Sequence, residues 1–231
     1  MQAWLAVGGG QMLWDDLAAH DGWKPLLVGH TGPQTGLWSD RPLTTPTDLA
    51  GCDVAISGLG GQVLRALGAR PTHVPATEIA AMMTDGSLSA AEVGSPLSGL
   101  MLGLPQVASH YYTGGIHPAG RTTALNIRLD VWKKMSASDQ AILEGIAAQE
   151  LALSLAEARA HAQLALDTIA ATPSLAIAPL PASLAAAVDA ATADVLVAKT
   201  SQSVTVARIH HSYLAFRKTV GGTIDRLQTI S

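Results

Sequence analysis

Apolar positions along the chain alternate between short runs typical of buried strands and longer stretches with helical spacing. In the first stretch apolar residues recur at helical spacing over residues 11–21, and Gly22 follows as a glycine that can end a helix. Further strands are expected at 25–28, 52–57, 71–75, 88–92, 106–112, 123–129 and 175–178, and further helices from near Gly61, at 77–84, at 96–104, after Ser183 and at 204–227. Strands that alternate with helices predict an α/β fold with a mostly parallel sheet.

Two stretches depart from this alternation. Residues 29–49 are dense in Gly, Pro, Thr and Asp, which predicts a long ordered turn, and such loops between core elements often carry function. Residues 138–171 are dominated by Ala, Leu, Gln and Glu, and no Gly or Pro occurs between Ile146 and Thr172. They predict one helix longer than the usual roughly 8 to 20 residues.

Composition excludes several classes of protein. With 231 residues, 48% of them hydrophobic, the chain is long enough for one large or two small domains with a real core, and disorder is excluded. A net charge of -4 with 14% charged residues argues against nucleic acid and anionic membranes as partners. The single cysteine, Cys52, excludes an internal disulfide and is expected to be a buried, inert thiol.

The chain start lacks the basic segment of a secretory signal, so we expect either a cytoplasmic protein or a missing N-terminus. The sequence GLGGQV at residues 58–63 lies between a predicted strand and a predicted helix, and this invites a dinucleotide-binding reading with Glu78 as the ribose-binding acid. However, Val63 stands where that fingerprint needs a small residue. A tight turn whose exposed helix amides favour a carboxylate fits better.

Several blocks in the same order resemble the solute-binding proteins of tripartite ATP-independent periplasmic (TRAP) transporters, of the DctP type, in the subgroup for 2-oxo and 2-hydroxy carboxylates. The resemblance runs over residues 3–230. It is carried by GHTGPQTGLW (29–38), PLTTPTDLAG (42–51), GLGGQVLRALGA (58–69), AAEVGSP (90–96), HYYTGGIHPAG (110–120) and SYLAFRK (212–218).

The resemblance implies an α/β, periplasmic-binding-protein-like fold of the class II two-lobe type, with lobe one incomplete, a long lobe-bridging helix and a helical C-terminus. The expected parts are a helical remnant of lobe one (1–24), the ligand-binding lobe two (25–122), a strand and turn returning to lobe one (123–137), the bridging helix (138–171) and a C-terminal strand and helices (172–231). We expect a truncated gene product or a degenerate paralogue whose exposed faces, or whose C-terminal helices, favour a homodimer.

In the family, a glutamine, two glutamates and a tryptophan surround a cation that bridges to the ligand, and an arginine before the glycine turn pairs with the ligand's carboxylate. Here Gln34 and Glu92 match the glutamine and the first glutamate. The other positions have changed, since the arginine is Ala55, the tryptophan Val93, the second glutamate Pro118 and an asparagine His30. The lost arginine matters most, because hydrogen bonds to charged groups are worth about 1.5 to 3 kcal/mol each.

The resemblance therefore implies that a small organic acid contacts Gln34, His30, Gly58, Glu92, Val93 and His117. A Na⁺ or Ca²⁺ ion would be held by Gln34, Glu92 and the backbone of Val93, and Arg121 could reach in from a neighbouring turn.

The implied function is capture of that acid in the periplasm and its delivery to TRAP membrane subunits, without catalysis. Two alternatives stay open. One is a non-binding remnant with only an interaction role, and the other is an enzyme that uses the turn from Gly58 to Gly61 for a cofactor.

Overall fold

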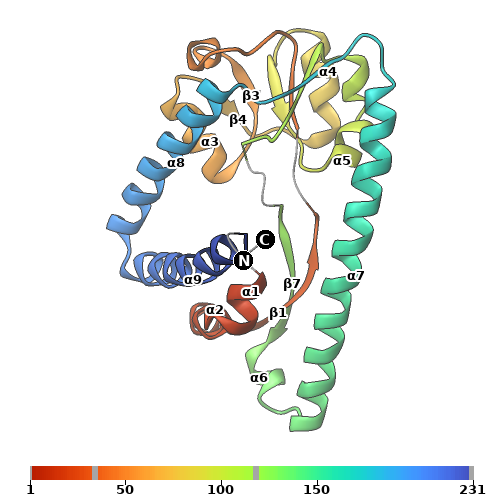
Figure 1. Ribbon diagram of the computed structural model, residues 1–231. Helices are drawn as coiled ribbons and strands as arrows, with labels where there is room; N and C mark the ends of the chain where they lie inside the picture. The colour runs from red at the N-terminus through yellow and green to blue at the C-terminus, as the bar shows by residue number, and fades with distance from the viewer. Residues whose placement is uncertain (1, 33–35, 117–119, 229–231) are drawn as a thin grey trace. The chain divides into compact units, whose positions relative to one another are not determined.

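The computed structural model describes residues 2–32, 36–116 and 120–228, with side chains as far as 221. It divides into two compact units. Unit one comprises Met1–Leu27, Ala124–Ala147 and Leu196–Ser231, and unit two comprises Val28–Thr123 and Ala148–Val195. All four boundaries fall inside elements, namely strands β1 (Trp23–His30) and β7 (Thr122–Arg128) and helices α7 (Ala137–Ala170) and α8 (Ala182–Gln202), so the chain passes between the units without a loop (Figure 1).

Unit two is built on a six-stranded sheet with the order β4-β3-β5-β2-β6-β8. The strands are β2 (Leu37–Ser39), β3 (Asp53–Ala55), β4 (Arg70–Thr72), β5 (Ala90–Glu92), β6 (His110–Thr113) and β8 (Ala176–Pro179). Neighbouring strands are parallel except at β2, which is antiparallel to both β5 and β6. The prediction of a mostly parallel sheet is confirmed, and the one exception is β2, which lies in the segment expected as a turn.

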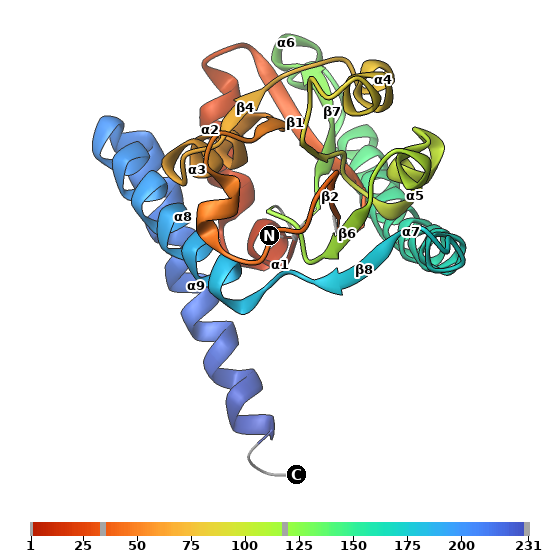
Figure 2. The same ribbon diagram turned by 90° about the horizontal axis from the view of Figure 1, so that it is seen from above.

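Both faces of this sheet are covered, which explains why its strands are apolar at consecutive positions. Leu37, Val54 and Tyr112 point into one hydrophobic cluster, which includes α3 (Gly58–Ala66) and α8. Their neighbours Trp38, Ala55 and Tyr111 point into the other cluster. That cluster lies on the face covered by α4 (Ile79–Thr84), α5 (Pro96–Met101) and α7 (Figure 2). The alternation follows from the two-residue period of a strand.

Unit one contains α1 (Gln2–Val7), α2 (Gly10–Ala19), α6 (Leu129–Trp132), the first part of α7 and α9 (Val204–Gln228), beside the paired strands β1 and β7. Trp4 joins α1 to α9, because its indole nitrogen donates to Ser212 Oγ at 3.1 Å and its ring meets Tyr213 edge-on at 5.6 Å. Trp4 is only 7% exposed, whereas Tyr213 is half-buried, so the indole is the buried partner of this contact.

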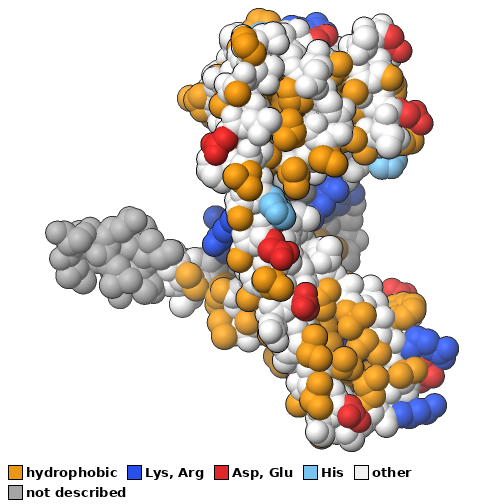
Figure 3. Space-filling view, turned by 90° about the vertical axis from the view of Figure 1, so that its right-hand side faces the viewer, with side chains coloured by type: hydrophobic (Ala, Val, Ile, Leu, Met, Phe, Trp, Pro, Cys, Tyr) orange, Lys and Arg blue, Asp and Glu red, His pale blue; other side chains and the backbone are white. Residues whose placement is uncertain are grey.

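Helix α7 confirms the prediction of one long helix, and α9 confirms the terminal helix. The side of the molecule on which α7 lies carries hydrophobic side chains among charged ones (Figure 3). Large apolar side chains of α7 that are exposed include Ile142, Ile146, Leu153 and Leu164. None of the helices in the described ranges is long and apolar enough to span a membrane.

Other boundaries differ from the predictions. Helix α1 was not expected, and α3 begins at Gly58 rather than near Gly61 because Ser57 is still extended, with φ -132° and ψ 177°. The predicted strand at 106–112 is wrong in its first half. Gly103, with φ 73°, and a proline in the first turn start a 3-10 turn, η3 (Leu104–Gln106), and only the later residues pair as β6.

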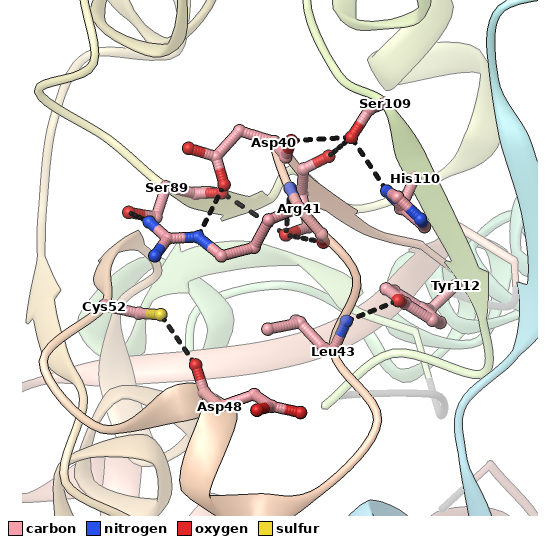
Figure 4. A network of polar contacts seen from close by, with 10 residues as sticks. Asp40, Arg41, Leu43, Asp48, Cys52, Ser89, Ser109, His110 and Tyr112 are labelled. Carbon is pink, nitrogen blue, oxygen red and sulfur yellow. Dashed lines mark hydrogen bonds and ion pairs between the residues drawn. The ribbon is translucent and has the colours of Figure 1, made fainter.

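The expected ordered turn contains β2, and a polar network holds the segment that follows it (Figure 4). The hydroxyl of Tyr112 accepts from the backbone nitrogen of Leu43 at 2.6 Å, and Ser109 Oγ donates to the Asp40 carbonyl at 2.6 Å. Cys52 is 3% exposed, donates to the Asp48 carbonyl, and has a pKa raised by burial, which confirms the prediction of a buried thiol.

Two further 3-10 turns complete unit two, η1 (Pro46–Leu49) before β3 and η2 (Ala76–Glu78) before α4. Asp48 closes the first of them, because its carboxylate accepts from the backbone nitrogens of Thr44 and Thr45 at 2.7 and 2.8 Å. These bonds lower the pKa of Asp48 to about 2.

Candidate functional site

A cavity of about 330 Å³ opens at the carboxyl ends of three neighbouring parallel strands of unit two. Ala55, Thr72 and Glu92 are the last residues of β3, β4 and β5, and all three line it. In open α/β sheets, ligands bind outside this edge of the strands. The remaining lining residues are Ile56, Ser57, His73, Val74, Pro75, Ala76, Ile79, Val93 and Arg121. We call this space the strand-end cavity.

Glu92 contributes a buried carboxylate to the strand-end cavity. The residue is 9% exposed, and its Oε2 accepts a hydrogen bond from the backbone nitrogen of Ile116 at 2.6 Å. Gly115 allows this approach, since a Cβ there would lie 3.3 Å from Oε2. A buried charge is costly unless it is hydrogen-bonded, so the turn before Ile116 is built to support the carboxylate.

Arg121 contributes the positive charge. Its backbone is fixed by Thr31, whose Oγ1 accepts from the Arg121 nitrogen at 2.9 Å and whose own nitrogen donates to the Arg121 carbonyl at 2.9 Å. Gly120 has φ +75°, and a Cβ there would meet the Gly32 carbonyl oxygen at 2.0 Å, so only glycine fits before Arg121. The arginine side chain is exposed, and the described residues place no carboxylate within ion-pair distance of its guanidinium.

A second cavity of about 390 Å³ shares Arg121 and Val93 with the first and lies between α5 and α7. Seven of its eleven lining residues have polar side chains, namely Thr31, Ser95, Ser98, Arg121, Ser154, Glu157 and His161. We call it the helix-side cavity. Arg121 and Val93 therefore line two neighbouring spaces within one unit.

Among the predicted ligand-contacting residues, Glu92 and Val93 come together at the strand-end cavity, beside Ala55. Gly58 is exposed at the start of α3 and lines neither cavity, whereas its neighbour Ser57 does line the first. Gln34 and His117 lie outside the described residues, as does Pro118. The predicted set is thus described only in part, and its role stays a prediction.

His30 lines neither cavity and has a clear structural role. Its Nδ1 accepts from the Gly32 backbone nitrogen at 3.0 Å, and its own backbone nitrogen donates to Ser154 Oγ at 3.1 Å. Burial lowers the pKa of His30, and the charge of Arg159 adds to this. The His30 ring therefore caps the turn that carries Gly32.

The donors present suit a hard cation better than a transition metal. Within 2–32, 36–116 and 120–228, no three His, Cys, Asp or Glu side chains gather as a metal cluster. Glu92 supplies one carboxylate at the strand-end cavity, and the backbone carbonyl of Val93 follows it directly. Carboxylate and carbonyl oxygens are ligands for Ca²⁺, whereas zinc and copper favour imidazole and thiolate.

Sequence reasoning missed the wall formed by Thr72, His73, Val74 and Ile79. A signal for it was available, because the segment at 71–75 was predicted as a strand of a parallel sheet, and the ends of such strands meet at one edge.

Residues 2–200 match a protein family described as bacterial extracellular solute-binding protein, family 7, or DctP. The chain belongs to this family. DctP proteins are solute-binding proteins of transport systems, and DctP is not a family of enzymes.

Known DctP relatives match the chain in sequence and in structure. A monocarboxylate 2-oxoacid-binding periplasmic protein of Nostoc, all3028, is 32% identical over 142 residues, which cover 62% of this chain and 39% of that protein. The matched part is thus less than two thirds of the relative's length. A TRAP solute-binding protein from Bordetella bronchiseptica, solved with calcium and picolinate, has a TM-score of 0.90 at 24% identity over 99% of this chain and 68% of its own.

A second solved protein, from Pseudoalteromonas atlantica with sodium and pyruvate, has a TM-score of 0.87 at 24% identity, over 100% of this chain and 71% of its own. At these identities the structures establish the fold. They confirm the expected α/β, periplasmic-binding-protein-like fold with a helical C-terminus.

Proposed function

We propose that this DctP chain is the solute-binding subunit of a TRAP transporter, and that it captures a small 2-oxo or 2-hydroxy carboxylate in the periplasm for delivery to the membrane subunits. Family membership supports a transport role, and the ligands named for the relatives are small carboxylates with Na⁺ or Ca²⁺. The proposal includes no reaction on the ligand.

The strand-end cavity carries this proposal, because it presents a buried carboxylate and a guanidinium without a described partner to the same space. A hard cation held by Glu92 and the Val93 carbonyl would neutralise the carboxylate and offer its free positions to the oxo and carboxylate oxygens of a ligand. The turn at Ile116 keeps the Glu92 carboxylate in place before any ligand arrives, which lowers the cost of binding.

The enzyme alternative finds less support in the described part of the chain. Among the residues that line the strand-end cavity, no serine or threonine hydroxyl is hydrogen-bonded to the imidazole of His73. Acyl transfer needs a hydroxyl nucleophile bonded to a general base, and these residues do not form one. Gly60 and Gly61 are buried inside the first turn of α3, and Gly58 faces solvent rather than either cavity. The glycines therefore serve the helix start.

The test is a thermal melt of the full chain, freed of metal with a chelator, with pyruvate and related 2-oxo acids in the presence and absence of Ca²⁺ or Na⁺. A ligand at 100 times its dissociation constant adds about 2.7 kcal/mol of stability. For a chain of this size that raises Tm by roughly 5 to 10 °C. We expect the rise only when acid and cation are present together.

Glu92→Gln is the matching variant, because glutamine still offers an oxygen to the Ile116 nitrogen but carries no charge. It should lose the cation-dependent shift, while its melt without ligand falls by only a few degrees, since the excess of a charged over a neutral hydrogen bond is about 1 kcal/mol. Glu150→Gln, on the exposed side of α7 and away from both cavities, is the control and should behave as the wild type.

Three results would count against the proposal in different ways. No shift with any acid would favour a non-binding remnant, and a shift with NAD or a nucleotide would favour the enzyme. An unchanged cation-dependent shift in Glu92→Gln would remove Glu92 from the site.

A further inference from the structure

We infer that His30 is a proton-sensitive positioning residue, whose imidazole holds the turn that fixes Arg121 and releases it when the ring gains a proton, so that ligand capture weakens in acid. The inference is carried by the close approach of the His30 ring, the Gly32 backbone and the segment of Gly120 and Arg121. The effect on capture rests on the proposed function, whereas the response of the turn does not.

The cap on the turn is one hydrogen bond between a backbone donor and a ring acceptor. The Gly32 nitrogen donates to His30 Nδ1 at 3.0 Å, and Gly32 has the positive φ of +71° that such a turn needs. A backbone N–H can only donate, so Nδ1 receives this bond with a lone pair. The imidazolium form has an N–H at both ring nitrogens and accepts at neither. One proton therefore removes the bond and sets two donors against each other.

The capped turn lies directly against the segment that carries Arg121. A Cβ on Gly120 would meet the Gly32 carbonyl oxygen and would stand 2.7 Å from His30 Cε1. Thr31, between the two capped residues, donates from its nitrogen to the Arg121 carbonyl and accepts the Arg121 nitrogen at its Oγ1, both at 2.9 Å. Arg121 lines both cavities. Loss of the cap therefore reaches the cavities through Thr31.

The backbone of His30 itself is held independently of the ring. Its nitrogen donates to Ser154 Oγ of α7 at 3.1 Å, and that hydroxyl donates to the Leu151 carbonyl at 3.1 Å. These bonds do not involve the imidazole, so a proton on the ring leaves them in place. The change is expected in the turn after His30 rather than in the strand that ends there.

The surroundings of the ring disfavour its charged form. Burial lowers the pKa of His30, and the positive charge of Arg159 on α7 lowers it further. Two more titratable groups of α7, Glu157 and His161, line the helix-side cavity with Arg121. Within the described ranges no carboxylate lies at ion-pair distance from the His30 ring. Since the folded state keeps the ring neutral, the stability that the cap contributes is present above a pH of about 6.5 and is lost as the pH falls below it.

Asparagine is the matched replacement for His30. Its side-chain oxygen can accept from the backbone nitrogen two residues on, as in an Asx turn, and it does not titrate. His30→Asn therefore keeps the cap and removes the proton sensitivity. His30→Ala removes both. His20→Asn is the control, because His20 is an exposed histidine at the end of α2 and lines neither cavity.

The first experiment needs no ligand and follows the full chain by NMR from about pH 7.5 to about pH 5, a window that includes the ordinary histidine pKa and stays above those of free carboxylates. The Gly32 amide signal should shift with the same midpoint as the His30 ring, below pH 6.5. His30→Asn should lose this shift, and His20→Asn should keep it. A Gly32 amide that does not respond in this window overturns the inference.

The second experiment measures the dissociation constant of pyruvate by calorimetry, with Ca²⁺ present, at both ends of this pH window. The wild type should bind roughly fivefold to tenfold more weakly at the lower pH, which is the effect of one lost hydrogen bond on an equilibrium constant. His30→Asn should change less than about twofold over the same range. His30→Ala should bind at the higher pH about as weakly as the wild type does at the lower one, and His20→Asn should follow the wild type.

The outcomes separate this inference from the proposed function. An equal loss of affinity in wild type and His30→Asn would assign the pH dependence to another group, such as His73 of the strand-end cavity, and would overturn the role of His30. If pyruvate binds at neither pH, the proposed function and the effect on capture fail together, while the Gly32 signal still decides whether the turn responds. Circular dichroism checks that each variant is folded, and if His30→Ala is not, the comparison of wild type with His30→Asn decides.

Discussion

Replacing Gly99 by alanine tests how α5, which lines the helix-side cavity, is held against the sheet. Helix α5 follows Glu92 and Val93 after two residues, and it lies directly on the indole of Trp38. A Cβ at Gly99 would stand 2.4, 2.7 and 2.8 Å from three atoms of that indole. Such distances are well inside van der Waals contact, so either the ring or the helix must move.

The indole has little room to move. Trp38 is 1% exposed, its ring lies 4.3 Å from that of Tyr111, and its strand is paired on both sides. Overpacking of this kind costs about 1 to 3 kcal/mol, and three contacts below 3.0 Å place Gly99→Ala toward the upper end. The higher helix propensity of alanine returns about 0.5 to 1 kcal/mol. The expected net loss is therefore roughly 2 kcal/mol.

Urea unfolding followed by far-UV circular dichroism measures this loss. With a slope of about 2 to 3 kcal/mol per molar urea for a chain of this size, the midpoint should fall by roughly 0.7 to 1 M. Gly145→Ala is the control, because a Cβ at that position of α7 meets nothing within 4 Å. Its midpoint should rise by roughly 0.2 to 0.5 M from helix propensity alone. A midpoint for Gly99→Ala equal to or above the wild type would refute the packing of α5 on Trp38.

Two further predictions concern the polar network beside β2. Tyr112→Phe removes the acceptor of the buried Leu43 nitrogen and should lower the free energy of unfolding in urea by about 1 to 3 kcal/mol. The control is Tyr213→Phe, whose lost hydroxyl makes no hydrogen bond to the described residues, and it should change the free energy of unfolding little. Equal losses in the two variants would contradict this account. The pKa of Asp48, lowered to about 2 by bonds from Thr45 and Thr44, implies stability that is present above the ordinary pKa of about 3.9 and lost as pH falls toward 2. Asp48→Asn should therefore show a smaller fall in Tm between about pH 4 and 2 than the wild type, and parallel Tm curves would exclude this role.

Much of the fold follows from local patterns. The absence of Gly and Pro between Ile146 and Thr172 predicts α7, and the single Cys52 in an apolar run predicts a buried thiol. Strand direction does not follow in this way, because the three residues of β2 bury both faces equally well in either orientation. Only the pairing of β2 with β5 and β6 decides it.

The candidate site divides in the same manner. The sequence by itself predicted that Glu92 ends a strand, and its resemblance to the family implied that Ala55 stands where the relatives have an arginine. The resemblance suggested that Arg121 could reach in, and the tertiary structure decided that this residue, 29 positions after Glu92, lines the same cavity and that Ile79 of α4 lines it as well. It also decided that His30 caps a turn instead of facing that space. The reason is physical, since burial and turn preferences act between near neighbours in the chain, whereas a binding surface is formed where distant segments pack together.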